Sequence, residues 1–261
     1  MIARPNVAAK KIELIGYERL RIYFISRRNV AAPGKPFRAN TTYADIIQIY
    51  KCDARLRHIV FEACGAFELA FRNSMSEVLT SLHGSHPQAQ AAAFASAGAR
   101  ADADRMLGEI FNNSRDPRAR HYRAQYSRPP LPPLWTMKEF MTFGSSVRFY
   151  KALASPIRTT IAAEFGLPSY PMMTQWLECL VDLRNICAHH DRLWNRTFQK
   201  QPQRLRAASV PAAATPLQKL KAILECLDYM LNQRGIPSHS TAEVEKVLRR
   251  YSQIQLAEAG F

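Results

Sequence analysis

The stretch PMMTQWLECLVDLRNICAHH, from Pro171 to His190, decides the fold. Its proline stands where the first turn of a helix tolerates one, and no Gly or Pro interrupts the residues behind it. Its apolar residues recur with the period of an α-helix that buries one face, and they include Met173, Trp176, Leu177, Leu180 and Cys187. Similar helical periods dominate the rest of the chain, and no series of alternating strands appears. The sequence therefore predicts an all-α protein.

Arg184 is unusual within this helix because it falls inside the apolar stripe. At about 100° per residue, it lies roughly 40° from Leu180 around the helix axis. Burying an unpaired guanidinium is costly. We therefore expect Arg184 either to meet a carboxylate, with Glu68 and Glu62 as candidate partners, or to be held in a shared cleft that binds an anion.

Asn185 and His189 form an i, i+4 pair on the opposite, polar side of the helix. Together with Arg184 they suit metal-free cleavage of RNA, in which a base deprotonates the ribose 2′-OH, an acid protonates the leaving 5′-oxygen and a cation neutralises the phosphorane. Arg184 and His189 lie about 140° apart, so one copy cannot easily aim both at one phosphate. A symmetric dimer would bring the two side chains together across its two-fold interface.

Bulk properties favour a polyanionic partner. The 261 residues carry a formal net charge of +15, with an isoelectric point near 9.9. Such a basic surface favours nucleic acid, and an anionic membrane is the weaker option. No transmembrane or secretory apolar stretch is found, so we expect a cytoplasmic protein that binds RNA and no membrane.

The cysteines are typical of small core residues in a reducing compartment. They are five in number and scattered: Cys52, Cys64, Cys179, Cys187 and Cys226. No Cys-x-x-Cys pair exists, and the surroundings of Cys187 and His190 lack a second ligand pair at zinc-like spacing. We therefore expect neither a metal nor a cofactor.

Eight helical segments are predicted, and we expect them to form a single domain over residues 1–261. They run from about 8 to 27, 43 to 82, 88 to 111, 137 to 153, 157 to 165, 171 to 190, 216 to 233 and 241 to 255. The second could divide into two, and Thr42 and Asp45 could cap its start. The alanine-rich stretch 88–103 predicts an exposed or lightly packed helix.

Two further basic segments are candidates for contact with RNA. Residues 115–128 interleave cations with aromatics, including Arg118, Arg120, Tyr122 and Arg123, a pattern that can neutralise phosphates and stack unpaired bases. A solvated basic connector explains them equally well. A stiff proline cluster follows, which we expect to guide Trp135 into the core. The second segment, 199–215, predicts a loop or mobile flap whose cations include Lys200, Arg204 and Arg206.

Several blocks of sequence resemble a known family. The segment LRNICAHHDRLWNR, residues 183–196, is similar to the signature of the Abi-like abortive-infection family of the AbiD and AbiF type, a bacterial branch of the HEPN superfamily. The resemblance continues, in order, over most of residues 12–196. It includes the blocks Leu131-Pro132-Pro133-Leu134-Trp135 with Glu139, Thr142, Phe143 and Gly144; Asp45-Ile46-Ile47 with Tyr50, Asp53, Leu56, Arg57, Glu68, Leu69 and Arg72; and Ile15-Gly16-Tyr17 with Arg19-Leu20.

This resemblance implies an all-α, HEPN-like helical bundle with additional helices, and residues 197–261 would add a C-terminal flap and helices. It also implies a metal-independent endoribonuclease, usually a homodimer, that acts in phage defence and leaves 2′,3′-cyclic phosphate ends. Arg184 would stabilise the phosphorane, His189 would transfer protons and Asn185 would orient the imidazole or the substrate. The supporting candidates for binding the RNA backbone are His190, Arg192, Asn195 and Arg196. His190 lies at the edge of the apolar stripe, and we favour a packed core histidine there.

Two alternatives stay open. A non-catalytic RNA-binding module would keep the basic surface and use the motif in a structural salt-bridge network. A toxin component would be held silent by a cognate antitoxin protein or a small regulatory RNA, and a discrete RNA would then copurify with it.

Overall fold

The computed structural model describes residues 5–261 and confirms the all-α prediction. Within them the chain forms twelve α-helices, and its only extended pairings are isolated bridges such as the one between Phe94 and Leu153. The first four residues of the expected domain lie outside the described part. None of the helices in residues 5–261 combines the length and the apolarity that crossing a bilayer requires.

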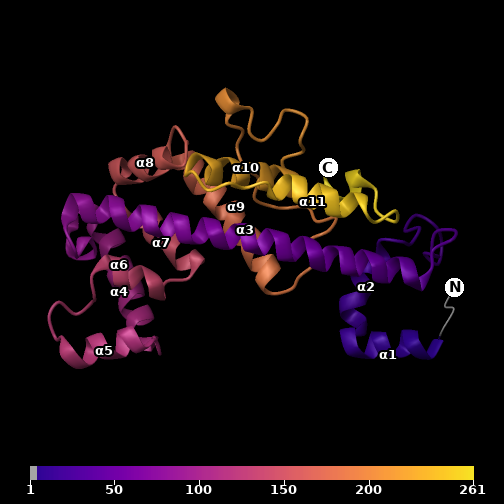
Figure 1. Ribbon diagram of the computed structural model, residues 1–261, viewed down its shortest axis with the longest axis horizontal. Coiled ribbons are helices and arrows are strands. Elements are labelled where there is room, and N and C mark those ends of the chain that lie inside the picture. The colour runs from indigo at the N-terminus through magenta and orange to yellow at the C-terminus, as the bar shows by residue number, and fades with distance from the viewer. Residues whose placement is uncertain (1–4) are drawn as a thin grey trace.

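The helix α3 (Tyr43–His83) runs along the whole molecule (Figure 1). A capping box starts it, as predicted: Asp45 N donates to Thr42 Oγ1 (3.2 Å) and Thr42 N donates to Asp45 Oδ2 (2.8 Å). It contains no proline and continues for 41 residues, about 60 Å at the usual rise of a helix. The expected segment 43–82 is therefore one helix and does not divide.

The core lies between α3 and the helices that cross it. α3 packs against α8 (Ser155–Glu164), α9 (Tyr170–Ala188), α10 (Leu220–Gln233) and α11 (Ser240–Arg249). Phe67 and Phe71 of α3 meet the fully buried ring of Phe165 at centroid distances of 5.3 and 6.3 Å. Such tilted aromatic pairs add specific packing to the burial of apolar area. The crossing of α3 and α9 thus fixes where the end of α9 lies.

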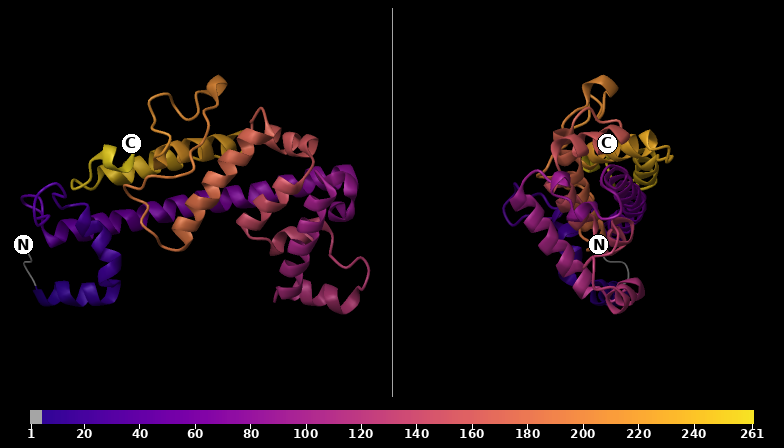
Figure 2. Two further views of the ribbon diagram at one scale, coloured as in Figure 1. Left: turned by 180° about the vertical axis from the view of Figure 1, so that it is seen from behind. Right: turned by 90° about the vertical axis from the view of Figure 1, so that its left-hand side faces the viewer.

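Two helical arms project from the ends of α3 toward the same side as the end of α9 (Figures 1 and 2). One arm consists of α1 (Pro5–Ile15) and α2 (Tyr17–Ile25). The other consists of α4 (Ala97–Asn113) and α5 (Pro117–Gln125). The C-terminal end of α9 lies between the two arms along the length of α3.

The expected helix from 8 to 27 is wrong in one respect, because it is two helices. Gly16 separates α1 from α2 and adopts a φ of 91°, which glycine tolerates and other residues rarely adopt. The chain turns there, and α2 leads back toward α3.

The expected helix from 88 to 111 begins only at Ala97. Ser96 caps it there by accepting a hydrogen bond from Ala99 N (3.1 Å). The preceding residues instead pair with another segment, since Ala95 N donates to Ala152 O (3.0 Å) and Ala154 N donates to Ala93 O (2.9 Å). Ala93 is fully buried, so the prediction of an exposed, alanine-rich helix over 88–103 is wrong for its first part.

The proline cluster leads into α6 (Leu134–Met137), a 3₁₀ turn and α7 (Phe143–Ala152), so the expected helix from 137 to 153 is interrupted. Thr142 caps α7 by accepting from Ser145 N (3.2 Å). Trp135 is 51% exposed, and Leu134 and Met137 fill the core in its place. The prediction that Trp135 enters the core is therefore wrong, because α6 turns its neighbours inward.

The C-terminal helices are shorter than predicted. α10 starts at Leu220 rather than near Pro216. The helix expected over 241–255 ends at Arg249 as α11, and a short α12 (Leu256–Ala259) begins only after that segment.

Asp228 fixes the start of α11, where it accepts hydrogen bonds from Ser238 Oγ (2.6 Å), Ser240 N (2.9 Å) and Thr241 N (2.9 Å). Burial acts to raise the pKa of Asp228, but these hydrogen bonds outweigh it and hold the pKa below its ordinary value. A lowered pKa contributes stability above the unfolded-state value of about 4, and this contribution is lost as pH falls through the folded-state value.

We therefore expect the free energy of unfolding to fall below about pH 4, in part through Asp228. Urea denaturation of the native protein and of Asp228→Asn at neutral and acidic pH measures that part. Asp228→Asn should be less stable at neutral pH and lose less stability on acidification. An identical pH dependence in the two proteins would contradict this role of Asp228.

Candidate functional site

The last turn of α9 carries the motif, and the helix ends at Ala188. His189 N still donates to Asn185 O (2.9 Å), but His190 has a φ of 56° in the left-handed region. Both imidazoles are exposed at the end of the helix. The prediction that His190 is a packed core residue is therefore wrong, because the chain leaves the helix before the apolar stripe reaches that position.

Arg184 lies on α9 where that helix crosses α3, and its side chain is 27% exposed. Its Nε is 3.5 Å from Glu68 Oε2 without forming a hydrogen bond, and its Nη1 donates to Asn185 Oδ1 (3.3 Å). The guanidinium carbon is 6.0 Å from the centre of the Phe61 ring. Of the two expected carboxylate partners, Glu68 is therefore the one that meets Arg184.

A buried carboxylate of α3 holds the loop that follows the motif. Asp53 Oδ1 accepts hydrogen bonds from Leu193 N (3.1 Å) and Trp194 N (2.5 Å). Tyr23 Oη donates to Asp53 Oδ2 (2.5 Å), and Arg57 forms an ion pair with the same oxygen. Arg57 Nη1 also donates to Asp191 O (3.2 Å).

Burial raises the pKa of Asp53, and the hydrogen bond from Tyr23 and the charge of Arg57 act against this rise. Four donors converge on this one carboxylate, so its negative charge is balanced inside the fold. The network fixes the backbone of residues 191–194 directly behind the two histidines.

Two open pockets lie beside the end of α9. One, of about 480 Å³, is lined by Ala54, Arg57, His58, Phe61, Cys187, Ala188 and His190. The other, of about 510 Å³, is lined by Ile22, Asp191, Arg192, Asn195, Arg196 and Thr197. Arg19 of α2 connects this region to the N-terminal arm, because its Nη1 donates to His190 O (2.9 Å).

The structure thus brings several of the expected substrate-binding residues together. Arg192, Asn195 and Arg196 share one pocket, and His190 lines the other. Sequence reasoning did not assign a role at the site to His58 and Phe61, which share the pocket of His190. They are exposed residues on one face of α3, and only the crossing of α3 and α9 brings them to the motif.

The basic residues of segment 115–128 lie elsewhere, on the arm of α4 and α5 (Figure 1). The segment forms the helix α5, which the sequence did not predict, with Asp116 as its cap accepting from Arg118 N (2.8 Å). Tyr122 Oη donates to Pro129 O (2.9 Å), and Arg123 donates to Phe111 O and to Ser114 O (2.9 Å). These two side chains bind the protein itself, whereas Arg120 is exposed.

The cations of loop 199–215 are also largely engaged within the protein. Arg204 donates to Pro211 O (2.9 Å) and Thr215 O (2.6 Å), and Lys200 donates to Asp182 Oδ1 (2.9 Å). Trp176 Nε1 donates to Gln203 O (2.8 Å) and fastens the loop to α9. The loop is therefore pinned at several points along its length.

The cysteines are core residues, as predicted: all five are free and buried. Burial raises the pKa of Cys187 to about 12, so its thiol is protonated at neutral pH although it lines a pocket. Within residues 5–261, no group of three or more His, Cys, Asp or Glu side chains could hold a metal ion.

Comparison with known proteins identifies a family. The model of the family described as "Abi-like protein" matches residues 10–195, which run from the middle of α1 to beyond the end of α9 and include Arg184, Asn185 and His189. No curated protein and no solved structure matches the chain. Because the family model spans well over half of the sequence, the chain belongs to the Abi-like protein family.

Proposed function

We propose that this protein is a metal-independent endoribonuclease of the HEPN superfamily that acts in abortive infection and cleaves single-stranded RNA. The 2′-OH of the ribose attacks the adjacent phosphorus, the bond to the leaving 5′-oxygen breaks, and a 2′,3′-cyclic phosphate and a 5′-hydroxyl result. His189 transfers the proton, Arg184 stabilises the phosphorane and Asn185 orients these groups. Membership of the Abi-like family supports the role in abortive infection.

The placement of Arg184 carries this proposal. Its guanidinium stands at the surface crossing of α9 and α3, close to Glu68 but without a hydrogen bond to it. The unpaired Nε is buried, and a guanidinium held by such a loose ion pair keeps its Nη2 free to donate to a phosphate oxygen. Exposed imidazoles and two open pockets lie at the end of the same helix.

We further propose that the active form is a homodimer. At about 100° per residue, Arg184 and the C-cap His189 are expected to point about 140° apart around the axis of α9. The end of α9 lies between two arms that project to its own side, so a second copy could face it there (Figure 2). A two-fold axis near α9 would bring Arg184 of one copy to His189 of the other.

Incubation with RNA in EDTA tests the proposed activity. The purified protein is mixed with a mixed-sequence single-stranded RNA, and the ends of the products are analysed chemically. Cyclic phosphate ends from the native protein, and none from His189→Ala, are the expected result. Intact RNA that remains bound to the native protein would contradict cleavage under these conditions.

The ion pair between Arg184 and Glu68 favours a second candidate function. If that pair is structural, the protein would be a non-catalytic RNA-binding module. Arg184→Ala would then lower the melting temperature and change RNA binding little. Under the nuclease proposal, the same variant loses cleavage.

A further inference from the structure

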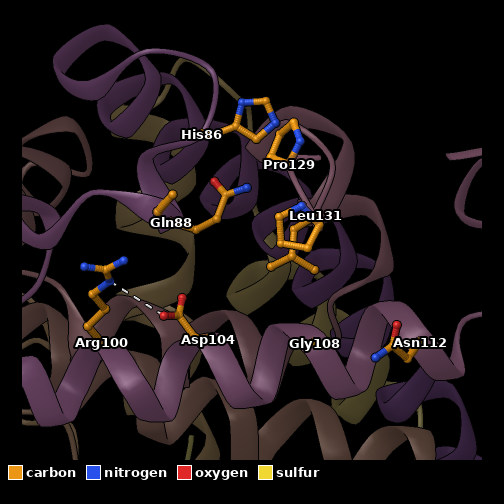
Figure 3. Close-up of a pocket in the computed structure, with 10 residues that line it drawn as sticks. His86, Gln88, Arg100, Asp104, Gly108, Asn112, Pro129 and Leu131 are labelled. Atoms are coloured by element: carbon orange, nitrogen blue, oxygen red, sulfur yellow. Dashed lines mark ion pairs between the residues drawn. The ribbon is translucent and has the colours of Figure 1, made fainter. Parts of the chain in front are cut away.

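A cavity of about 380 Å³ lies on the opposite arm from α1 and α2 and far along the chain from the motif (Figure 3). Its walls are α4, the 3₁₀ turn Pro87–Ala89 and the proline stretch that follows α5. The lining residues are His86, Gln88, Ala89, Arg100, Asp104, Gly108, Asn112, Pro129, Pro130 and Leu131. Half of these residues carry polar or charged side chains, and the apolar part of the lining comes from Ala89, Pro129, Pro130 and Leu131.

Two polar side chains of the cavity have unpaired atoms. Gln88 is only 2% exposed, and its Nε2 donates to Pro132 O (2.8 Å), which fixes the amide so that Oε1 is an acceptor. Neither Gln88 Oε1 nor His86 Nε2 has a hydrogen-bond partner among the described residues, although both atoms are buried. His86 Nδ1 lies 2.9 Å from Ser85 Oγ, which holds the ring in place. An unpaired buried acceptor such as Gln88 Oε1 is costly, so this lining favours a ligand that offers an N–H group, while His86 Nε2 donates or accepts according to its tautomer.

The apolar wall of the cavity suits a planar, aromatic ligand. Pro129 and Leu131 lie across the cavity from α4 (Figure 3), and Pro130 between them in the chain also lines it. Gly108 of α4 leaves that wall open, since a Cβ added there would meet nothing within 4 Å. A planar heterocycle with ring N–H or amino groups would fill such a slot and pair with Gln88 and His86. Unpaired nucleobases have these properties, and proteins read single strands by taking up bases that are splayed out of the stack.

The surrounding charge indicates that such a base would belong to a strand. Arg128 directly precedes Pro129 of the cavity wall, and Arg120 lies on α5. The side chains of both are exposed and make no ion pair or hydrogen bond within residues 5–261. Tyr122 and Arg123 hold α5 against both walls, through Pro129 and Leu131 on one side and Phe111 on the other. A phosphate backbone passing along α5 would therefore run beside the mouth of the cavity.

We propose that this cavity is a nucleobase-binding subsite that holds one unpaired base of a single-stranded RNA away from the cleavage motif. The inference rests on the proposed function, because it takes RNA as the ligand. It assigns the arm of α4 and α5 a part in substrate selection that is distinct from the chemistry at α9.

Binding measurements on a non-cleaving background test the subsite. Fluorescence anisotropy compares His189→Ala with His189→Ala/Gly108→Phe, in which a ring fills the cavity. The probes are an eight-nucleotide RNA and an abasic strand of the same length and charge. We expect the Gly108→Phe substitution to weaken binding of the base-bearing strand by about tenfold, within the range for one stacked base, and to leave the abasic strand unaffected.

Gly108→Ala is the matched control, because it adds a Cβ with free space and keeps the cavity. It should bind both strands as the parent does. If Gly108→Phe fails to fold, Gly108→Leu narrows the same wall with a good helix former. The proposal would be overturned if the filled variants bound the base-bearing strand as tightly as the parent does. It would also be overturned if the cavity took up only water or a free mononucleotide.

The subsite and the nuclease proposal can fail separately. If the native protein cleaves RNA in EDTA and Gly108→Phe leaves both affinity and cleavage pattern unchanged, the subsite is wrong and the nuclease stands. If no protein cleaves but Gly108→Phe loses base-dependent binding, the subsite stands and the nuclease is wrong.

Discussion

Replacing His189 with alanine is expected to lower the rate of RNA cleavage by about 10²–10⁴-fold, the usual contribution of one general acid or base. The fold should not change, because the imidazole is exposed and its side chain makes no hydrogen bond or ion pair within residues 5–261. Cleavage rates under single-turnover conditions in EDTA, together with melting curves of both proteins, measure the two effects. A large loss of rate at an unchanged melting temperature separates a chemical role from a structural one.

His190→Ala is the matched control for this experiment. It removes an exposed imidazole one residue along the chain, at a residue whose φ is 56° where that of His189 is −85°. We expect a smaller loss of rate, because contact with a phosphate contributes to binding rather than to proton transfer. The opposite order, with His190→Ala inactive and His189→Ala active, would overturn the assignment and move the chemistry to the pocket that holds His190 and His58.

Mixing inactive variants extends the same test to the dimer. If each site combines Arg184 of one copy with His189 of the other, Arg184→Ala and His189→Ala are each inactive as homodimers. A heterodimer of the two regains one intact site and loses the other completely. Random exchange of subunits should therefore restore about a quarter of the native rate, since half of the dimers are mixed and each has one of two sites. No recovery after exchange would place both residues in one copy.

Local patterns predicted α3 and α9, and they gave two candidate partners for Arg184. The stripe on α9 forced a choice between a carboxylate and an anion, and Glu68 of α3 is indeed beside the guanidinium. Thr42 and Asp45 likewise cap α3 as their spacing predicted. The cap depends on residues within one helical turn. The ion pair depends on a partly buried charge that needs an oppositely charged partner.

Features that depend on distant backbone were not predictable in the same way. The start of α4 was misplaced because Ala93 and Ala95 pair with the backbone at 152–154 rather than with their own helix. His190 is exposed because the chain turns there with a φ of 56° at His190, and no glycine or other turn residue at this position predicts that turn. Asp53 was visible as a charged residue between the apolar Cys52 and Leu56, a pattern like that of Arg184. Its partners at Leu193 and Trp194, however, lie 140 and 141 residues away.

Replacing Asp53 with alanine is expected to destabilise the protein by about 3–5 kcal/mol, the usual cost of leaving one partner of a buried ion pair alone. The substitution strands Arg57, whose side chain is 7% exposed, and removes the acceptor of Tyr23. It also frees the amides of Leu193 and Trp194, so the loop behind His189 should open. Urea denaturation measures the loss of stability, and hydrogen exchange at these two amides measures the opening.

Asp182→Ala provides the control, because it removes a carboxylate whose partner Lys200 is 48% exposed. A surface pair of this kind contributes less than about 1 kcal/mol, so the variant should unfold near the native midpoint. If Asp53→Ala were equally mild, the carboxylate could not be what holds residues 191–194. The Asp53→Ala variant could instead show rapid hydrogen exchange at both amides and lose cleavage under conditions where it stays folded. Asp53 would then be a positioning residue that acts on the motif through the backbone of residues 191–194.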